Sequence, residues 1–380
     1  MRSSLPSRGF LAVLSAMAFA ACGGALESTP SSTGTTGVAS GTTTGGGTTG
    51  GGSTTGGVRR ATTGTSTTTG TGTTGTGTGG TTGGATATGG GVIGPNGGQV
   101  PSLVFAVVGD TRPDIPDDTQ GYPSQVISQI YTDIQGLSPR PQFVVGTGDY
   151  MNADPYLGQQ ASPQAQLYTQ AAAVFTGQIF PTMGNHECLT ITSSNCCPTC
   201  SGGTPSNYTA FLTDLLGHFG LPNQLPYYSV SMSSSDPTNP WTAKFVFVAA
   251  NAWDDGQSTW LRGILAQPTT YTFVVRHEPD YDNSSCTGCG ASDAIVKAFP
   301  YTLLLTGHDH TFKTVPASSE LVVGVGGAQL DSSSADQYGY VVCSQEPGGN
   351  IACQESDYNS ATSSYQNSSM TVTPKGTPVP

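Results

Sequence analysis

Residues 103–110 read LVFAVVGD, an unbroken apolar run that ends in a glycine and an aspartate. A run of this length is typical of a strand buried on both faces, as in a parallel sheet covered by helices. The Gly109-Asp110 step indicates that the chain then leaves the strand and enters a loop. The stretch therefore predicts a central strand with a carboxylate at its carboxyl end.

The same arrangement recurs along the chain, because other apolar runs are also followed by short polar motifs. The runs 143–145, 179–183, 271–275 and 301–306 precede Gly148-Asp149, Gly184-Asn185-His186-Glu187, Arg276-His277 and Gly307-His308-Asp309-His310, respectively. Amphipathic segments at 124–136, 162–177 and 257–266 predict helices between the strands. This alternation predicts an α/β domain with a parallel or mixed sheet and a site at the carboxyl ends of its strands.

The folded part is smaller than the 380-residue chain. Residues 28–91 are almost entirely glycine, threonine and serine, and a segment without apolar side chains cannot offset the entropy that it loses on ordering. We therefore expect a disordered spacer at 23–99 and a folded domain at 100–353. Because the remaining residues are rich in serine, threonine, asparagine and proline, we also expect a disordered tail at 354–380.

The charge balance limits the possible partners. The chain has 24 acidic and 12 basic residues, which give a formal net charge of −12. Nucleic-acid binding requires clustered lysine and arginine to neutralise phosphates, so we expect no nucleic-acid partner. Bound metal cations would offset part of the acidic excess.

The first 22 residues predict export. Arg2 and Arg8 precede an apolar run at 10–21, which is too short for a membrane span and typical of a signal peptide. The run ends Phe19-Ala-Ala-Cys22, which resembles the lipobox of bacterial lipoproteins, although leucine is usual where Phe19 stands. We expect a lipoprotein, periplasmic or on the cell surface, anchored to the membrane through lipidated Cys22. The alternative is an ordinary cleaved signal peptide.

The other cysteines predict disulfide bonds. They are Cys188, Cys196, Cys197, Cys200, Cys286, Cys289, Cys343 and Cys353. An even number in an exported chain is typical of a disulfide framework, and we expect the Cys343–Cys353 pair to close a terminal hairpin. Zinc binding is the alternative, because 197/200 and 286/289 are pairs spaced by two residues.

Four of the five histidines lie in the polar motifs that follow the predicted strands. Imidazole and carboxylate groups placed where strands pass into loops are typical of metal catalysis. Histidines scattered through a core would not be grouped in this way. The motifs therefore predict a hydrolytic metalloenzyme.

The order of these motifs resembles that of the calcineurin-like metallophosphoesterase superfamily, over residues 103 to about 343. The resemblance implies a four-layer α/β/β/α sandwich of two mixed sheets flanked by helices. It also implies a hydrolase of phosphate esters, a phosphatase or phosphodiesterase, in which a metal-bridging hydroxide attacks phosphorus in line. Two metal ions held close together would activate water and neutralise the phosphate. Manganese, zinc and iron all suit such ligands.

The resemblance also implies a role for each polar residue. The first metal would bind Asp110, Asp149 and His310, and the second would bind Asp149, Asn185, His277 and His308. His186 would be the general acid, with its ring held by Glu187 or Asp110; a structural histidine is the alternative.

Arg112 departs from the commonest family pattern, which has a histidine at this position. An arginine is always protonated and has no lone pair for a metal, so the first metal loses a nitrogen ligand. Arg112 could instead bind a phosphate oxygen, or form a salt bridge to Asp114 or another local acid. The purple acid phosphatase branch has a tyrosine three residues after its bridging aspartate, but here Asn152 occupies that position and Tyr150 follows Asp149 directly.

These observations predict an exported metallophosphoesterase that acts on a small phosphate ester or a phosphorylated macromolecule. The rival hypothesis is a surface-displayed binding protein whose metallophosphoesterase fold is catalytically degenerate, and the missing ligand at Arg112 motivates it. A metal-dependent hydrolase of another ester is a third possibility.

Overall fold

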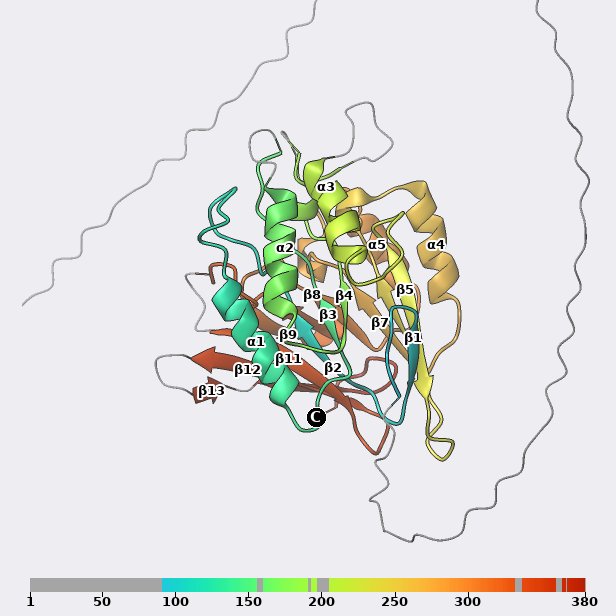
Figure 1. Ribbon diagram of the computed structural model, residues 1–380. Coiled ribbons are helices and arrows are strands. Elements are labelled where there is room, and N and C mark those ends of the chain that lie inside the picture. The colour runs from blue at the N-terminus through green and yellow to red at the C-terminus, as the bar shows by residue number, and fades with distance from the viewer. Residues whose placement is uncertain are drawn as a thin grey trace, which may run out of the picture. The chain divides into compact units, whose positions relative to one another are not determined.

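Two mixed β-sheets lie face to face in the structure, a computed structural model of the chain (Figure 1). The structure describes residues 91–155, 160–190, 193–196, 205–331, 337–359, 364–366 and 368–379. These residues all belong to one unit of the chain, Gly83–Pro380. The predicted signal peptide, its Cys22 and the predicted spacer up to residue 90 lie outside the described residues.

The first sheet contains the strand that decides the fold, β2. Its strand order is β13-β12-β11-β2-β3-β4, and β14 also pairs with β12. The strands are β2 (Val104–Val108), β3 (Phe143–Gly146), β4 (Gln178–Pro181), β11 (Tyr338–Gln345), β12 (Ile351–Asn359), β13 (Ser364–Gln366) and β14 (Ser369–Val372). Because β2, β3 and β4 are parallel, their carboxyl ends meet at one edge.

The second sheet has the strand order β1-β5-β6-β7-β8-β10-β9. Its strands are β1 (Gly97–Val100), β5 (Tyr228–Ser234), β6 (Thr242–Phe247), β7 (Tyr271–Val275), β8 (Leu303–Thr306), β9 (Phe312–Val315) and β10 (Glu320–Val323). The neighbouring strands β6, β7 and β8 are parallel. The loops after β7 and β8 therefore leave the same edge of this sheet.

Alternate side chains of the central strands explain why their sequences are apolar throughout. In β6, Phe245 faces the first sheet, where its ring centroid lies 5.1 Å from that of Phe105 in β2. Its neighbour Val246 belongs to a separate cluster with residues of α4 and α5. Phe273 of β7 also lies 5.1 Å from Phe105. Each strand thus contributes one row of side chains to the core between the sheets and one to the core beneath the helices.

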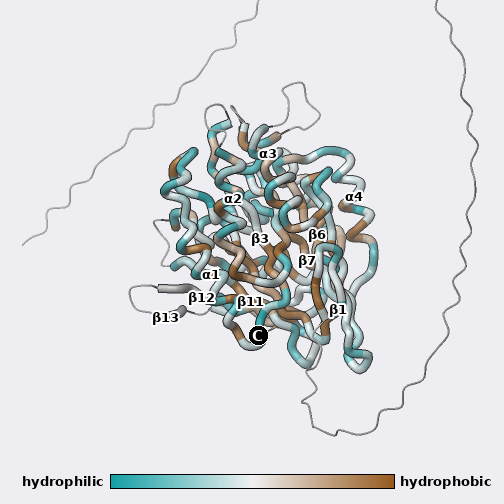
Figure 2. Tube along the Cα trace, in the orientation of Figure 1, coloured by the Kyte–Doolittle hydropathy of each residue, from teal (hydrophilic) through white to brown (hydrophobic). Residues whose placement is uncertain are grey.

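Helices cover the outer faces of both sheets. The helices α1 (Ser124–Gly136) and α2 (Ala161–Ala172) pack over the first sheet, and α4 (Asp255–Leu265) and α5 (Cys289–Val296) over the second. The predicted α/β/β/α sandwich is confirmed, and Figure 2 shows the most hydrophobic positions along its inner strands. Short helical segments connect the layers: η1 (His186–Cys188), α3 (Ser206–Ala210), η2 (Phe211–Leu216), η3 (Ala250–Ala252), η4 (Asp280–Asp282) and η5 (Pro316–Ser318).

The prediction of a disordered tail at 354–380 is wrong for the described residues. β12 continues to Asn359, and β14 pairs with β12 so that Met370 lies opposite Cys353. Met370 and Val372 alternate with polar residues and are buried. The polar composition hid this strand because serine and threonine are tolerated on the exposed face of an edge strand. At the other boundary, β1 begins at Gly97, inside the predicted spacer.

The described cysteines form three disulfides. Cys343 and Cys353 lie directly opposite each other on β11 and β12 and are bonded, as predicted. Cys188 is bonded to Cys196, and Cys286 to Cys289. The zinc alternative is therefore wrong for the 286/289 pair, because bonded sulfurs are not thiolate ligands. Residues 197 and 200 lie outside the described residues.

No helix in the described part of the chain combines the length and apolar character that crossing a membrane requires.

We predict that deleting residues 354–380 strongly destabilises the domain. The deletion removes the buried side chains of Met370 and Val372, each of which contributes about 1.5–3 kcal/mol by leaving water, and it shortens β12. The melting temperature of the truncated chain, measured by circular dichroism, should fall well below that of the full chain. Equal melting temperatures would contradict the structural role of β14.

Candidate metal centre

The polar motifs meet where the carboxyl edges of the two sheets lie together. Three of their residues, Asp110, Asp149 and His308, have left-handed backbone conformations, with φ of 58°, 58° and 72°. Residues other than glycine adopt this conformation rarely, and it is concentrated at functional sites, where the surrounding structure stabilises it. The local backbone is therefore shaped to direct these side chains inward.

The motif glycines allow the backbone to approach the carboxylates. A Cβ atom on Gly184 would lie 2.3 Å from Oδ1 of Asp149, and one on Gly307 would lie 2.3 Å from Oδ2 of Asp110. Real Cβ atoms essentially never come this close to another heavy atom. Both positions therefore require glycine.

Asp149 is the residue with the most polar contacts in the centre. Its Oδ1 accepts a hydrogen bond from the backbone N–H of His186 (3.1 Å) and lies 3.2 Å from Nε2 of His277. Its Oδ2 accepts from Nε of Arg112 (3.3 Å). Burial alone would raise the pKa of Asp149, but the positive charges that His277, His186 and Arg112 can carry lower this pKa well below its usual range.

Asp110 is fully buried beside Asp149. Its two carboxylate oxygens accept from the backbone N–H of His308, at 3.2 and 3.1 Å. Burial raises the pKa of Asp110 well above its usual range, and the nearby Asp149 adds to this shift. One ligand atom each from Asp110, Asp149 and His310 lie within 4.8 Å of one another.

A second group of ligand atoms surrounds the side-chain oxygen of Asn185. This Oδ1 lies 3.0 Å from Nε2 of His277 and 3.0 Å from Nδ1 of His308. The Nδ1 of His277 lies 2.8 Å from the carbonyl oxygen of Thr147, to which it donates, so Nε2 of the neutral ring carries the lone pair. Lone pairs of two oxygens, from Asn185 and Asp149, therefore face that of His277.

These contacts show that the residues fit a metal ion. Burial would lower the pKa of His277, yet the carboxylates of Asp149 and Asp110 raise it well above its usual range. The surroundings thus favour a positive charge at this ring, which a proton or a metal ion would supply. Imidazole, carboxylate and amide oxygen ligands together suit manganese, zinc or iron. Asp149, Asn185, His277 and His308 would form one position, and Asp110, Asp149 and His310 the other.

Arg112 contacts Asp149 and His310, two of the three residues of the position that also includes Asp110. Besides its ion pair with Asp149, its Nη2 lies 3.4 Å from Nε2 of His310, and its Nη1 donates to the carbonyl oxygen of Pro113 (3.3 Å). Of the two sequence-based alternatives, the salt bridge to a local acid is present, and the acid is Asp149. The guanidinium therefore lies inside the centre.

Asn152 and Tyr150 lie near the centre, but their side chains contact other groups. The side-chain amide of Asn152 donates to the carbonyl oxygens of Pro113 (3.2 Å) and Asp114 (2.9 Å), and so holds the Arg112 loop. Tyr150 is buried, and its ring packs with those of Tyr168 and Phe211 in the core. Tyr150 therefore cannot replace the tyrosine ligand of purple acid phosphatases.

Glu187 has a role that the sequence did not reveal. Its carboxylate accepts from the backbone N–H groups of Asp149 (3.0 Å), Tyr150 (2.7 Å) and Gly184 (2.7 Å). Burial, with the nearby charge of Asp149, raises the pKa of Glu187 to about 7. Glu187 thus joins the loops after β3 and β4, and the expectation that it holds the ring of His186 is replaced by this backbone role.

His186 lies at the edge of the centre, and its Nε2 is 3.8 Å from Oδ2 of Asp149. Its Nδ1 is buried and has no hydrogen-bond partner among the described residues. Burial is the main cause that lowers the pKa of His186 to about 4. Sequence reasoning also missed Asn207, a fully buried residue whose amide donates to the carbonyl oxygens of His186 (2.9 Å) and Ala153 (3.0 Å). No motif marks this asparagine.

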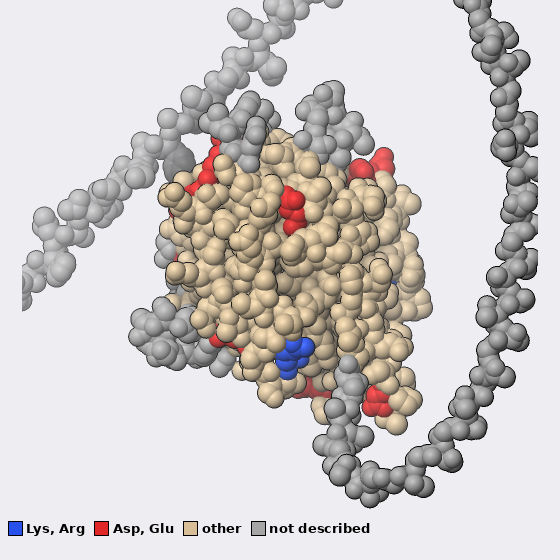
Figure 3. Space-filling view, viewed as in Figure 1, with Lys and Arg blue, Asp and Glu red and all other residues tan. Residues whose placement is uncertain are grey.

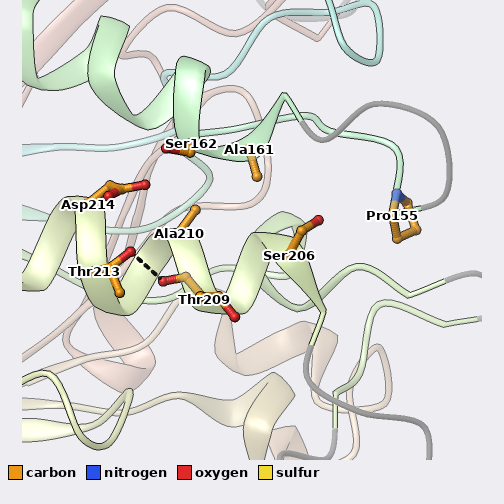
Figure 4. Close-up of a pocket in the computed structure, with 8 residues that line it drawn as sticks. All are labelled: Pro155, Ala161, Ser162, Ser206, Thr209, Ala210, Thr213 and Asp214. Carbon is orange, nitrogen blue, oxygen red and sulfur yellow. Dashed lines mark hydrogen bonds between the residues drawn. The ribbon is translucent and has the colours of Figure 1, made fainter.

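A pocket of about 550 Å³ lies elsewhere, between α2 and the α3–η2 segment (Figure 4). It is lined by Pro155, Ala161, Ser162, Ser206, Thr209, Ala210, Thr213 and Asp214. It contains no residue of the metal centre and only one ionisable side chain, Asp214. We therefore place the candidate site at the strand ends and not in this pocket.

Comparison with known proteins identifies the family of the chain. The family model for calcineurin-like phosphoesterases matches residues 103–312, more than half of the chain, and the chain belongs to this family. Members of the family typically bind a dinuclear metal centre. No curated protein matches the chain.

Solved structures with a similar fold share little sequence with the chain. GAP50, the anchor in the inner membrane complex of Plasmodium, is 15% identical with a TM-score of 0.47, and the match covers 72% of this chain and 89% of that one. A dimetal phosphatase from Danio rerio is 12% identical with a TM-score of 0.44, and the match covers 72% and 99%.

We predict that Glu187→Ala destabilises the metal-free protein by about 3 kcal/mol or more, because three buried N–H groups lose their acceptor at about 1–3 kcal/mol each. The free energy of unfolding should be measured by urea denaturation in the presence of a chelator.

Glu278→Ala is the matched control. Glu278 is also a buried glutamate beside a metal motif, but neither of its carboxylate oxygens has a hydrogen-bond partner among the described residues. Its loss should cost clearly less than that of Glu187. Equal costs for the two variants would contradict the role given to Glu187.

Proposed function

We propose that the protein is a metal-dependent phosphoester hydrolase. The observation that carries this proposal is the convergence of four ligand groups. Nε2 of His277 lies 3.2 Å from the carboxylate of Asp149 and 3.0 Å from Oδ1 of Asn185, and this Oδ1 also lies 3.0 Å from Nδ1 of His308. Such a set of carboxylate, amide oxygen and imidazole groups suits a metal cation. Membership of the calcineurin-like phosphoesterase family supports a phosphate ester as the substrate.

The ligands in this proposal come from five loops. Asp110, Asp149, Asn185, His277, His308 and His310 are the candidate metal ligands, and Asp149 faces both groups of them. Bound metal would acidify water and neutralise the charge of the phosphate. The loops hold the ligands through contacts that do not need the metal, such as the hydrogen bonds of Glu187 to the backbone.

His186 is the proposed general acid. It is tied to the centre through its backbone bond to Asp149 and through Asn207, and 16% of its side-chain surface is exposed. A ring at this place could give a proton to the leaving oxygen of a bound ester. Burial holds the pKa of His186 below its usual value, and the negative charge of a phosphate beside it would raise that pKa again.

Arg112 is the proposed phosphate-binding residue. Its side chain is 15% exposed, and a guanidinium group offers several N–H donors that match phosphate oxygens. Since it is anchored to Asp149, its position does not depend on substrate. It would therefore stabilise negative charge on phosphate oxygens without reorganisation.

The cellular setting also remains part of the proposal. We infer an exported lipoprotein, anchored through Cys22, that acts on a small phosphate ester or a phosphorylated macromolecule. The three disulfides support an oxidising compartment. The face shown in Figure 3 carries few Lys and Arg side chains, which supports the expectation that nucleic acid is not a partner.

We predict that the metal-loaded full chain hydrolyses nitrophenyl phosphate, a monoester, or bis(nitrophenyl) phosphate, a diester. A chelator should abolish the activity. Asn185→Ala should reduce activity by at least about 10–100-fold, the loss typical of weaker changes around a metal. His218→Ala, which removes an exposed histidine outside the centre, should retain full activity. If the loaded wild-type protein binds phosphate esters without turnover, the binding-protein hypothesis is the correct one.

We further predict that His186→Ala lowers kcat by about 10²–10⁴-fold for alkyl phosphate esters, which need a protonated leaving group. The loss should be much smaller for nitrophenyl esters, because nitrophenolate leaves without a proton. Steady-state kinetics with both ester types measures this difference. An equal loss for both would show that His186 is not the general acid.

A further inference from the structure

Arg112 occupies the place of one of the two cations. Resting on the proposed function, we propose that the centre binds a single metal ion, held by Asp149, Asn185, His277 and His308, and that the guanidinium of Arg112 fills the other position. The centre is then a metal–arginine pair. Arg112 already contacts two of the three residues of that other position, Asp149 and His310.

His310 has both ring nitrogens engaged without a metal. Its Nδ1 lies 2.6 Å from the carbonyl oxygen of Gln329, which can only accept, so Nδ1 carries the proton. Nε2 of the neutral ring therefore carries the lone pair. Arg112 Nη2 lies 3.4 Å from this atom and is a donor only, so it donates to His310. The lone pair that would bind a metal points at a positively charged group.

Asp149 divides its two oxygens between the two positions. Oδ1 faces Nε2 of His277, on the side of the Asn185 group, whereas Oδ2 accepts from Nε of Arg112. One way in which a carboxylate bridges two cations is with one oxygen on each. Here the first oxygen faces the candidate metal position and the second faces the guanidinium, so the bridging arrangement is complete with one metal.

The Arg112 side chain is held on its other side as well. Nη1 donates to the carbonyl oxygen of Pro113, and this same oxygen accepts from the amide of Asn152. Asn152 also donates to the carbonyl oxygen of Asp114. The loop that carries the guanidinium is thus fixed to the segment after β3, so that binding a metal to Asp110, Asp149 and His310 would require breaking several of these contacts.

The charges point in the same direction. Arg112 already places one positive charge against the buried carboxylate of Asp149. A second divalent ion would add two further charges directly against a guanidinium that cannot lose its proton. The two groups of ligands are therefore unequal. The group around Asn185 contains no arginine or lysine, whereas the group of Asp110, Asp149 and His310 already contains Arg112.

Metal content tests this inference directly. The full-length protein and its variants are incubated with excess Mn²⁺ and desalted. The number of metal ions per chain is then measured by inductively coupled plasma mass spectrometry. Electron paramagnetic resonance of the same samples distinguishes an isolated Mn²⁺ ion from a spin-coupled pair. Neither measurement depends on enzyme activity.

We expect one isolated Mn²⁺ per wild-type chain and nearly complete loss of it in Asn185→Ala. His310→Ala should keep the wild-type content, because His310 binds Arg112 and not the metal. Arg112→His should gain a second ion and a spin-coupled spectrum, since it removes the guanidinium and supplies a nitrogen ligand. Arg262→His, at an exposed arginine of α4, is the matched control and should keep one ion.

Two Mn²⁺ ions in the wild-type chain, or a loss of metal in His310→Ala, would overturn the inference and leave the proposed hydrolase standing. A wild-type chain without bound metal would overturn both. One isolated ion in a protein that turns over no phosphate ester would support the inference and contradict the proposed function. If Arg112→His does not fold, the wild-type and His310→Ala measurements still decide the question.

Discussion

The burial of two neighbouring carboxylates is the constraint on which the rest of the structure depends. Asp110 and Asp149 are buried where the sheet edges meet, and charges in such a place must be compensated. Each neighbouring motif supplies part of the compensation: backbone N–H groups of His186 and His308, the ring of His277 and the guanidinium of Arg112. The compensating groups of Asp149 come from loops of both sheets, so the contacts of this carboxylate link the sheets at this edge.

This arrangement requires unusual backbone conformations. Asp110, Asp149 and His308 are left-handed, and Gly184 and Gly307 leave no room for a side chain. Glu187 stabilises two of the loops by binding three N–H groups that no strand or helix satisfies. The positions of the metal-type ligands are therefore set by the protein before any ion binds, which is the condition for precise electrostatic catalysis.

The sequence patterns predicted an α/β domain and the grouping of the motifs, because both follow from short-range features, and the family resemblance implied the sandwich. Apolar runs mark buried strands, and the carboxyl ends of parallel strands share an edge. Contacts between distant polar residues leave no such pattern. Nothing in the sequence pairs Asn207 with His186, Glu187 with Tyr150 or Arg112 with His310. The strand β14 was missed for another reason, since its polar, edge-type composition does not differ from that of a flexible tail.

The disulfide between Cys188 and Cys196 has a consequence for the order in which the protein matures. Cys188 ends the η1 turn that begins with His186, and Cys196 donates its N–H to Asn251 after β6. In the same loop, the side chain of Asn195 accepts from the N–H of Thr287, between the bonded Cys286 and Cys289. The disulfide thus ties the His186 turn covalently to the 195–196 segment, which is hydrogen-bonded to the segments that follow β6 and β7. The bond forms only when the chain meets an oxidising environment, so the His186 turn is fastened to this segment at that step of maturation.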